Sequence, residues 1–303
     1  MSETIALSPT LCTTSWSEEW KRLQAARNAA DDPARWDARA RSYGGKRRHS
    51  AYAARFIELM DLRPGETLLD MGCGTGAVAL PVAEAGHRVI ARDFSRAMLD
   101  ELEKQAAEAG VVGIDADVMN WTEDWDARGV TADCVDVAAA SRSIGTFDMR
   151  DSFERLTRVA RRRACITLPT GPSPRSDERI LEELGLLDEL GRDYLYAFAI
   201  LAQMGLHPEV SYIEGVRDDS YANEQEAYDS LAKMVRDTAK TAADTVRVSR
   251  ALEDLRTWLV DNLVANERAG MPDEDGKPRG AFKLLRPRMV RWAFLSWDTA
   301  GRS

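Results

Sequence analysis

Apolar residues recur with two different spacings along the chain, and the spacing changes near residue 65. Before that point, aromatic and apolar residues lie three or four positions apart, as in Trp16 and Trp20 or in Tyr52, Phe56 and Met60. Such spacing predicts amphipathic helices. After it, short apolar runs rich in β-branched residues alternate with helical segments, which predicts an α/β protein with a parallel sheet built from βαβ units.

Seven of the short apolar runs are predicted strands. They cover residues 67–71, 88–91, 114–118, 134–140, 165–168, 209–214 and 289–296. Helices are predicted between them, over residues 76–85, 95–109, 151–161, 179–190 and 194–204. Strand and helix therefore alternate through most of the chain, as parallel strands joined by crossover helices require.

The chain of 303 residues is longer than such a sheet needs, and the surplus lies in two places. Residues 1–61 are predicted to form a helical lid. Residues 220–280 separate the last two strands, where a bare hairpin needs only about 2–5 residues, and their spacing predicts a helical cap insertion. The core then comprises residues 62–219 and 281–303. We expect the cap to enclose a substrate over the sheet; a dimer interface is the alternative.

A glycine-rich turn, Asp-Met-Gly-Cys-Gly-Thr-Gly from Asp70 to Gly76, closes the first strand and opens a helix. Its glycines allow a tight turn and close approach to a ligand, and the helix N-terminus offers N–H groups to negative charge. Asp93 ends the next strand, where an acid can accept hydrogen bonds from both hydroxyls of a ribose. A nucleoside-containing cofactor is therefore predicted. NAD fits the same pattern, and a purely structural turn is a further alternative.

These residues resemble the class I S-adenosylmethionine-dependent methyltransferases. The glycine-rich turn is similar to that family's first motif, and the run Asp-Phe-Ser-Arg-Ala-Met-Leu from Asp93 to Leu99 resembles its second. The resemblance implies a Rossmann-like seven-stranded sheet, mostly parallel, with an antiparallel last strand. It also implies an enzyme that uses S-adenosyl-L-methionine (SAM) to methylate a small-molecule acceptor and releases S-adenosylhomocysteine.

The resemblance further implies which residues contact the cofactor. The glycines line its methionine and ribose part, Asp70 holds the turn and the methionyl amino group, and Asp93 binds the ribose hydroxyls. The N-terminal Tyr43 resembles a tyrosine that touches the cofactor in relatives, with a core aromatic as the alternative. The cofactor-binding residues predicted in all are Tyr43, Asp70, Gly72, Cys73, Gly74, Gly76, Asp93, Phe94, Asn120, Trp121, Ser141 and Arg142.

Asn120 enters this set by its spacing, because the family's third motif places an adenine-binding residue about 27 positions after Asp93. Its amide oxygen can accept a hydrogen bond from the adenine amino group, with Trp121 beside it. Asp117 is the alternative if the third strand is displaced. Trp121 is also compatible with simple packing, and packing is the expected role of Trp125.

Ser141 and Arg142 follow the fourth strand, and ligands of parallel sheets bind at the carboxyl ends of the strands. They are expected to contact the methionine part or the acceptor, with an ordinary turn as the alternative. The triplet from Arg161 to Arg163 precedes the fifth strand at the opposite end of the sheet, and it is expected to be a solvated turn.

Methyl transfer is an in-line displacement that depends mainly on alignment, although some acceptors also need a general base. The chain has three histidines. His87 and His207 are predicted at the wrong end of the sheet. His49 lies in the segment that covers the cofactor in relatives, so it is the candidate base. No cluster with metal-ligand spacing is seen.

Composition narrows the partners. With 41 basic and 50 acidic side chains the net charge is −9, which argues against nucleic acid, and no Asn/Asp-Pro-Pro-Tyr segment of base-methylating enzymes is present. No run approaches the roughly 20 apolar residues of a membrane span, and no secretion signal is seen. Four scattered cysteines predict free thiols in a cytoplasmic protein. A homodimer, formed through the inserted cap, is a further option for a partner.

Two other functions are compatible with the glycine-rich turn. An NAD-linked oxidoreductase would carry a Tyr-x-x-x-Lys or comparable pair after the fourth strand, and no such pair is found. A non-catalytic SAM-binding regulatory module would bind the cofactor without an acceptor pocket.

Overall fold

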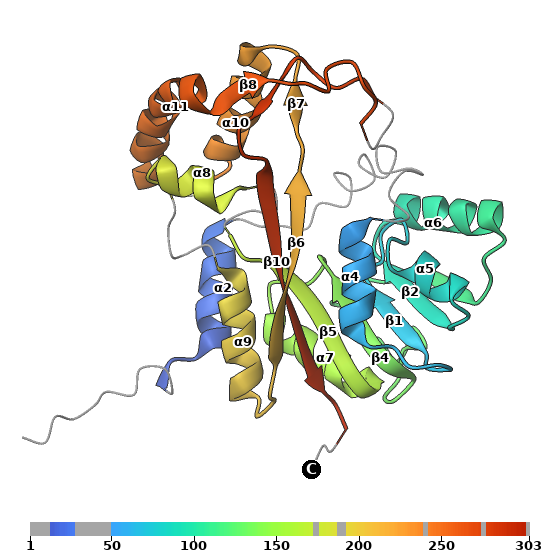
Figure 1. Ribbon diagram of the computed structural model, residues 1–303. Helices are drawn as coiled ribbons and strands as arrows, with labels where there is room; N and C mark the ends of the chain where they lie inside the picture. Colours follow the sequence, from blue (N-terminus) through green and yellow to red (C-terminus); the bar gives the residue numbers. More distant parts are fainter. Residues whose placement is uncertain are drawn as a thin grey trace, which may run out of the picture.

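The computed structural model describes residues 13–27, 50–171, 176–186, 192–238, 242–273 and 277–300. Seven strands form one twisted sheet in the order β3-β2-β1-β4-β5-β10-β6 (Figure 1). Strands β1 to β5 pair with one another in parallel, whereas β10 is antiparallel to both β5 and β6. The predicted α/β sheet with its antiparallel last strand is confirmed. The strands are β1 (Leu68–Met71), β2 (Val89–Asp93), β3 (Ile114–Val118), β4 (Val135–Ser141), β5 (Ala160–Pro169), β6 (Glu209–Arg217) and β10 (Arg288–Asp298).

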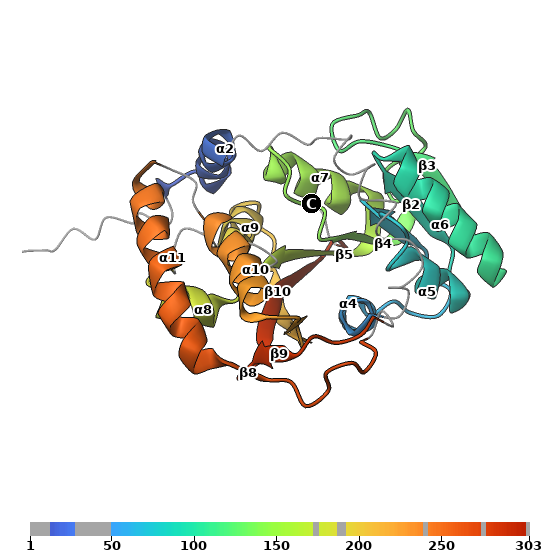
Figure 2. The same cartoon turned by 90° about the horizontal axis from the view of Figure 1, so that it is seen from above.

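Helices cover both faces of this sheet (Figure 2). Because successive side chains of a strand point to opposite faces, neighbouring residues enter different cores. Leu69 of β1 belongs to the core under α2, α7 and α9, whereas Leu68 belongs to the core under α4, α5 and α6. The helices are α2 (Trp16–Arg27), α4 (Ala51–Met60), α5 (Ala79–Glu84), α6 (Arg96–Ala109), α7 (Met149–Val159) and α9 (Asp193–Gln203).

The segment between β6 and β10 forms a separate layer above the sheet, and both strands run up into it (Figure 1). It holds α10 (Glu224–Arg236), α11 (Ala242–Asn262) and a small antiparallel sheet in the order β7-β9-β8. The strands of the small sheet are β7 (Ser220–Tyr221), β8 (Leu263–Ala265) and β9 (Phe282–Leu284). The expected helical insertion is therefore present, and it contains a short sheet that the helical spacing did not predict.

This layer has its own hydrophobic core. Leu231 and Val235 of α10 and Leu255 of α11 are fully or almost fully buried in it. Helix α8 (Glu178–Glu183) contributes Ile180 and Leu181 to the same core, although it precedes β6 in the chain. The predicted boundaries of lid, core and cap remain predictions.

The arginine triplet was wrongly predicted to be a solvated turn. It lies inside β5, which starts at Ala160 and pairs with β4. Arg161 bonds to Asp136 at 2.8 Å and Arg162 bonds to Glu66 at 2.6 Å, so carboxylates compensate the charges where the strand begins. Strand pairing and these partners outweigh the polarity that suggested a turn. The triplet does lie at the amino ends of the parallel strands, as expected.

Among the helices of the described ranges, none has both the length and the apolar character needed to cross a bilayer.

Candidate active site

The glycine-rich turn connects β1 to α5 at the carboxyl edge of the sheet. Gly72 has φ +75°, and an added Cβ would lie 2.3 Å from the Cβ of Ser143. Gly76 is also crowded, because a Cβ there would lie 2.9 Å from Cγ of Leu80. Gly74, with φ +54°, faces space where no atom lies within 4 Å of such a Cβ. Packing therefore requires the outer two glycines, and the middle one leaves room for a ligand.

Asp93 is the last residue of β2 and is held against this turn. Its carboxylate accepts the backbone N–H of Gly74 at 2.8 Å and that of Ser95 at 2.9 Å. Ser95 in turn caps α6 by accepting the backbone N–H of Met98. A carboxylate oxygen can accept more than one hydrogen bond, so the geometry is compatible with ribose hydroxyls as further donors.

Asp70 is a buried carboxyl group without a well-formed hydrogen bond. It lies in β1 between Leu69 and Met71 and is 1% exposed, and within the described ranges neither carboxylate oxygen has a hydrogen-bond partner of good geometry. Burial raises its pKa to about 7, and the nearby charge of Asp93 adds to this rise, whereas the backbone N–H of Ala79 and the charge of Arg142 oppose it. The Ala79 N–H points toward the carboxyl without meeting the geometry of a full hydrogen bond, so most of the acceptor capacity of Asp70 is unused. Because a buried carboxylate is costly without a donor, the site is compatible with an ammonium group as its missing partner.

Cys73 and Phe94 lie beside these acids. Cys73 is buried, and burial raises the pKa of its thiol well above the ordinary value, so it is an uncharged lining group. Phe94 directly follows Asp93 and is half-buried.

Asn120 lies just beyond β3 and forms a local turn. Its side-chain oxygen accepts the backbone N–H of Thr122 at 3.2 Å. β3 has the predicted bounds, so the condition that favoured Asp117, a displaced strand, does not hold. Trp121 is 7% exposed and packs against Trp125, with ring centroids 5.6 Å apart. Trp125 is a core residue, as expected.

The loop after β4 is anchored on two sides. Ser143 donates its hydroxyl to the carbonyl of Met71 at 2.6 Å, which ties the loop to the glycine-rich turn. The backbone N–H of Arg142 donates to Thr167 Oγ1 of β5 at 3.0 Å. The Tyr52 hydroxyl lies 2.6 Å from Thr167 Oγ1 and 2.9 Å from Ser141 Oγ.

Tyr52, Thr167 and Trp292 were not among the predicted site residues. Helical spacing placed Tyr52 on a packing face, and nothing in a strand pattern singles out Thr167. The ring of Trp292 on β10 lies 5.7 Å from that of Tyr52. Tyr43 and His49 lie outside the described residues, so the structure does not place them.

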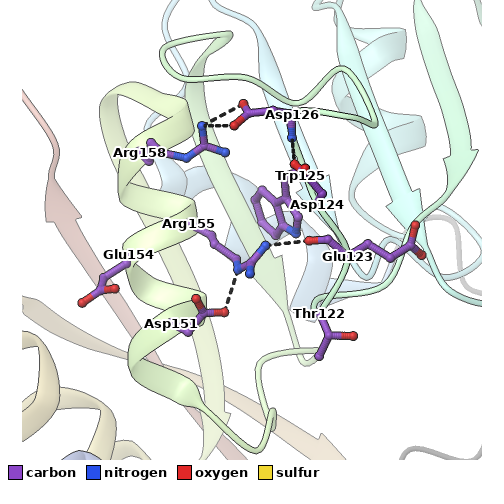
Figure 3. Close-up of a pocket in the computed structure, with 9 residues that line it drawn as sticks. All are labelled: Thr122, Glu123, Asp124, Trp125, Asp126, Asp151, Glu154, Arg155 and Arg158. Atoms are coloured by element: carbon purple, nitrogen blue, oxygen red, sulfur yellow. Dashed lines mark hydrogen bonds and ion pairs between the residues drawn. The ribbon is translucent and has the colours of Figure 1, made fainter.

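A surface hollow of about 500 Å³ lies elsewhere, between α7 and the loop after β3 (Figure 3). Its arginines are already engaged: Arg155 bonds to Asp151 at 2.6 Å, and Arg158 bonds to Asp126 at 2.8 Å. The hollow is lined by neither the glycine-rich turn nor Asp93. It is therefore not part of the candidate active site.

Comparison with known proteins supports this assignment. The family described as "Methyltransferase domain" matches residues 68–163. A Haemophilus influenzae protein described as uncharacterized is 31% identical over 207 residues, which cover 67% of this chain and 74% of the relative. The nocamycin O-methyltransferase of Saccharothrix syringae is 35% identical over 126 residues, covering 40% of this chain and 43% of that enzyme.

Among solved structures, the YcgJ protein from Bacillus subtilis has a similar fold. The TM-score is 0.50 at 14% identity, and the match covers 84% of this chain and 100% of that one. At this identity the likeness concerns the fold alone. Taken with the sequence matches, the chain belongs to the class I S-adenosylmethionine-dependent methyltransferases.

The chain is accordingly a methyltransferase, and its cofactor is SAM. The residues present fit this cofactor. The open space at Gly74 suits a close ligand, and the unpartnered carboxyl of Asp70 suits an ammonium group. The NAD-linked alternative is not supported, because the family match points to methyl transfer.

Proposed function

We propose that this enzyme transfers the methyl group of SAM to a small-molecule acceptor and releases S-adenosylhomocysteine. When bound, the cofactor supplies a methyl group activated by a positively charged sulfur. Two observations together carry the proposal: the open space beside Gly74, and the buried carboxyl of Asp70 that forms no hydrogen bond of good geometry with the described residues. A purely structural turn would have no need to keep such a carboxyl out of hydrogen bonds.

Further predicted residues complete the proposed site. Asp93 accepts the ribose hydroxyls while its bonds to the backbone hold the turn closed. Asn120 and Trp121 lie beside the adenine, and Asn120 shares its oxygen with the turn that it already forms. Tyr43 covers the cofactor, and His49 is the proposed general base for acceptors that must lose a proton.

The small-molecule class of the acceptor is supported by charge and by a relative. A net charge of −9 disfavours a polyanionic nucleic acid. The partial match to a nocamycin O-methyltransferase also points to a small acceptor. Cys73, Cys134 and Cys165 are free thiols, which is typical of the reducing cytoplasm, and we place the activity there.

Calorimetric titration with S-adenosylhomocysteine tests the proposal. We expect wild-type enzyme to bind it, and Asp93→Asn to weaken binding by about tenfold to a hundredfold, the effect of losing charge-assisted hydrogen bonds. Asp254→Asn is the matched control, because Asp254 is an exposed acid on α11, 3.9 Å from Arg250. Absence of binding to the wild type, or equal affinity in Asp93→Asn, would contradict the proposal.

A further inference from the structure

Arg142 is an exposed arginine at the active-site edge. Within the described ranges of the chain its guanidinium forms no ion pair with an acidic side chain. Its guanidinium carbon lies 4.3 Å from the ring centroid of Tyr52 and 5.8 Å from that of Trp292. Aromatic faces attract a cation and orient the planar guanidinium, but they leave its N–H groups available along the edge.

The backbone of Arg142 is also held in an uncommon conformation. Its φ is +61°, in the left-handed region that residues other than glycine rarely adopt. The hydroxyl of Thr167 accepts its backbone N–H, and the Tyr52 hydroxyl bonds to both Thr167 and Ser141. Strain of this kind persists where the surroundings enforce it and often marks a functional site. The hydroxyl groups of Thr167, Tyr52 and Ser141 thus fix the backbone of Arg142. Its guanidinium stacks on the Tyr52 ring and leaves its N–H groups to a ligand.

The position of the aromatic partners shows where this charge lies. The glycine-rich turn and Asp93 follow β1 and β2, on one side of β4 in the sheet order. Trp292 belongs to β10, which lies beyond β5 on the other side of β4. Arg142 is therefore placed between the cofactor half of the edge and the half under the cap. Its charge still acts on the carboxyl of Asp70.

We propose that Arg142 binds a carboxylate during the reaction, and that Tyr52 and Thr167 are positioning residues that hold it ready. This inference rests on the proposed function, because it assigns a ligand to the same site. A guanidinium matches a carboxylate with two parallel N–H···O bonds, which a simple strand-end turn would not require. The carboxylate is that of the acceptor. The rings that hold the guanidinium come from β10 and from α4, which packs against β6 and β10, whereas the glycine-rich turn and Asp93 lie on the other side of β4.

The experiment compares ligands that differ only in the carboxylate, in wild type and in Arg142→Gln. The first arm uses S-adenosylhomocysteine and its decarboxylated analogue, measured by calorimetry. The second arm uses benzoate and benzamide on enzyme saturated with S-adenosylhomocysteine, measured by ligand-observed NMR. Arg161→Gln is the matched control, because Arg161 is an exposed arginine at the opposite edge of the sheet.

We expect the wild type to prefer the carboxylate in the second arm by about tenfold to a hundredfold, and Arg142→Gln to lose that preference. The uncharged ligand should bind both proteins equally. A preference that Arg142→Gln loses only in the first arm would assign Arg142 to the cofactor carboxylate and overturn the inference. No preference in the second arm, or a preference there that survives Arg142→Gln, overturns it as well. If the wild type does not bind S-adenosylhomocysteine at all, the proposed function itself fails.

The positioning role has its own readout. Tyr52→Phe keeps the ring under the guanidinium but removes the hydroxyl, whereas Tyr52→Leu removes both. We expect the carboxylate preference to fall about threefold to tenfold in Tyr52→Phe, because only a neutral hydrogen bond is lost. In Tyr52→Leu we expect the preference to disappear, because the ring that orients the guanidinium is lost as well. Thr167→Ser, which keeps the hydroxyl, should retain the preference that Thr167→Val reduces. Equal loss of affinity for charged and uncharged ligands would indicate a merely structural role and contradict the assignment.

Discussion

Charged side chains lie at both ends of the parallel strands, and the two ends use them differently. At the amino ends, Asp136 accepts bonds from Arg161 and from the backbone and hydroxyl of Thr67, and Arg162 is paired with Glu66. At the carboxyl ends, the Asp70 carboxyl forms no hydrogen bond of good geometry with any residue in the described part of the chain.

Arg142, also at the carboxyl ends, differs in the same way from Arg161 and Arg162, which pair with carboxylates. It stacks on aromatic rings instead, and its backbone is in a left-handed conformation. Paired charges stabilise the fold, whereas groups left without partners are available to a ligand. The difference supports the proposal that one end of the sheet serves stability and the other serves binding.

Substitutions within the glycine-rich turn should have the largest effects and should separate packing from binding. Gly72→Ala forces a Cβ onto Ser143 in a left-handed conformation, so we expect about 2–4 kcal/mol of lost stability. Gly74→Ala meets no protein atom, so about 1–2 kcal/mol is expected from the backbone alone. Urea unfolding measures both.

Cofactor affinity should rank the same two variants in the opposite order: Gly74→Ala, the less destabilised variant, should be the weaker binder. Gly74→Ala, if folded, should bind S-adenosylhomocysteine at least about tenfold more weakly, because its methyl group enters the space left for the ligand. A Gly74→Ala protein with unchanged affinity would show that this space does not receive the cofactor.

The Asp70 carboxyl should make stability depend on pH. Its pKa rises from 3.8 to about 7 on folding, so the folded state holds a proton that the unfolded state has lost between these values. Below pH 3.8 the carboxyl is neutral in both states and its burial costs the fold no charge. As the pH rises from 3.8 toward 7, the free energy of unfolding decreases, because only the unfolded state releases the proton. Asp70→Asn should therefore be about 2–4 kcal/mol more stable than wild type at pH 8.

The measurement is denaturant unfolding of both proteins from pH 4 to pH 8, and the difference should widen with pH and level off above 7. Asp70→Asn should also lose affinity for S-adenosylhomocysteine. A difference that stays constant with pH would mean that Asp70 is not the titrating group.

Asp136→Asn should show the reverse pattern at the amino ends and a smaller effect. Removing its charge weakens the bonds to Thr67 and Arg161, so we expect about 1–3 kcal/mol of lost stability. Its affinity for S-adenosylhomocysteine, measured by calorimetry, should equal that of wild type. A large loss of affinity would show that the two ends of the sheet are not functionally separate.

Much of the fold was predictable because it depends on local patterns. Strand β3 has the predicted bounds, and helix α4 carries the predicted spacing of Tyr52, Phe56 and Met60, since each pattern lies within one short segment. The glycine-rich turn and Asp93 were equally visible, because a ligand-binding turn needs glycines and an acid at set spacings. The arginine triplet was misjudged, because its carboxylate partners come from other segments of the chain.

The sequence by itself therefore determined the order of strands and helices, the cofactor class through its family motifs, and the acids of the turn. Only the tertiary structure brought Tyr52 of α4, Thr167 of β5 and Trp292 of β10 to the loop that carries Arg142. It likewise placed α8 in the core of the cap. These contacts join residues far apart in the chain, and sheet pairing and helix packing decide which of them meet. Periodicity along one segment carries no record of such a partner.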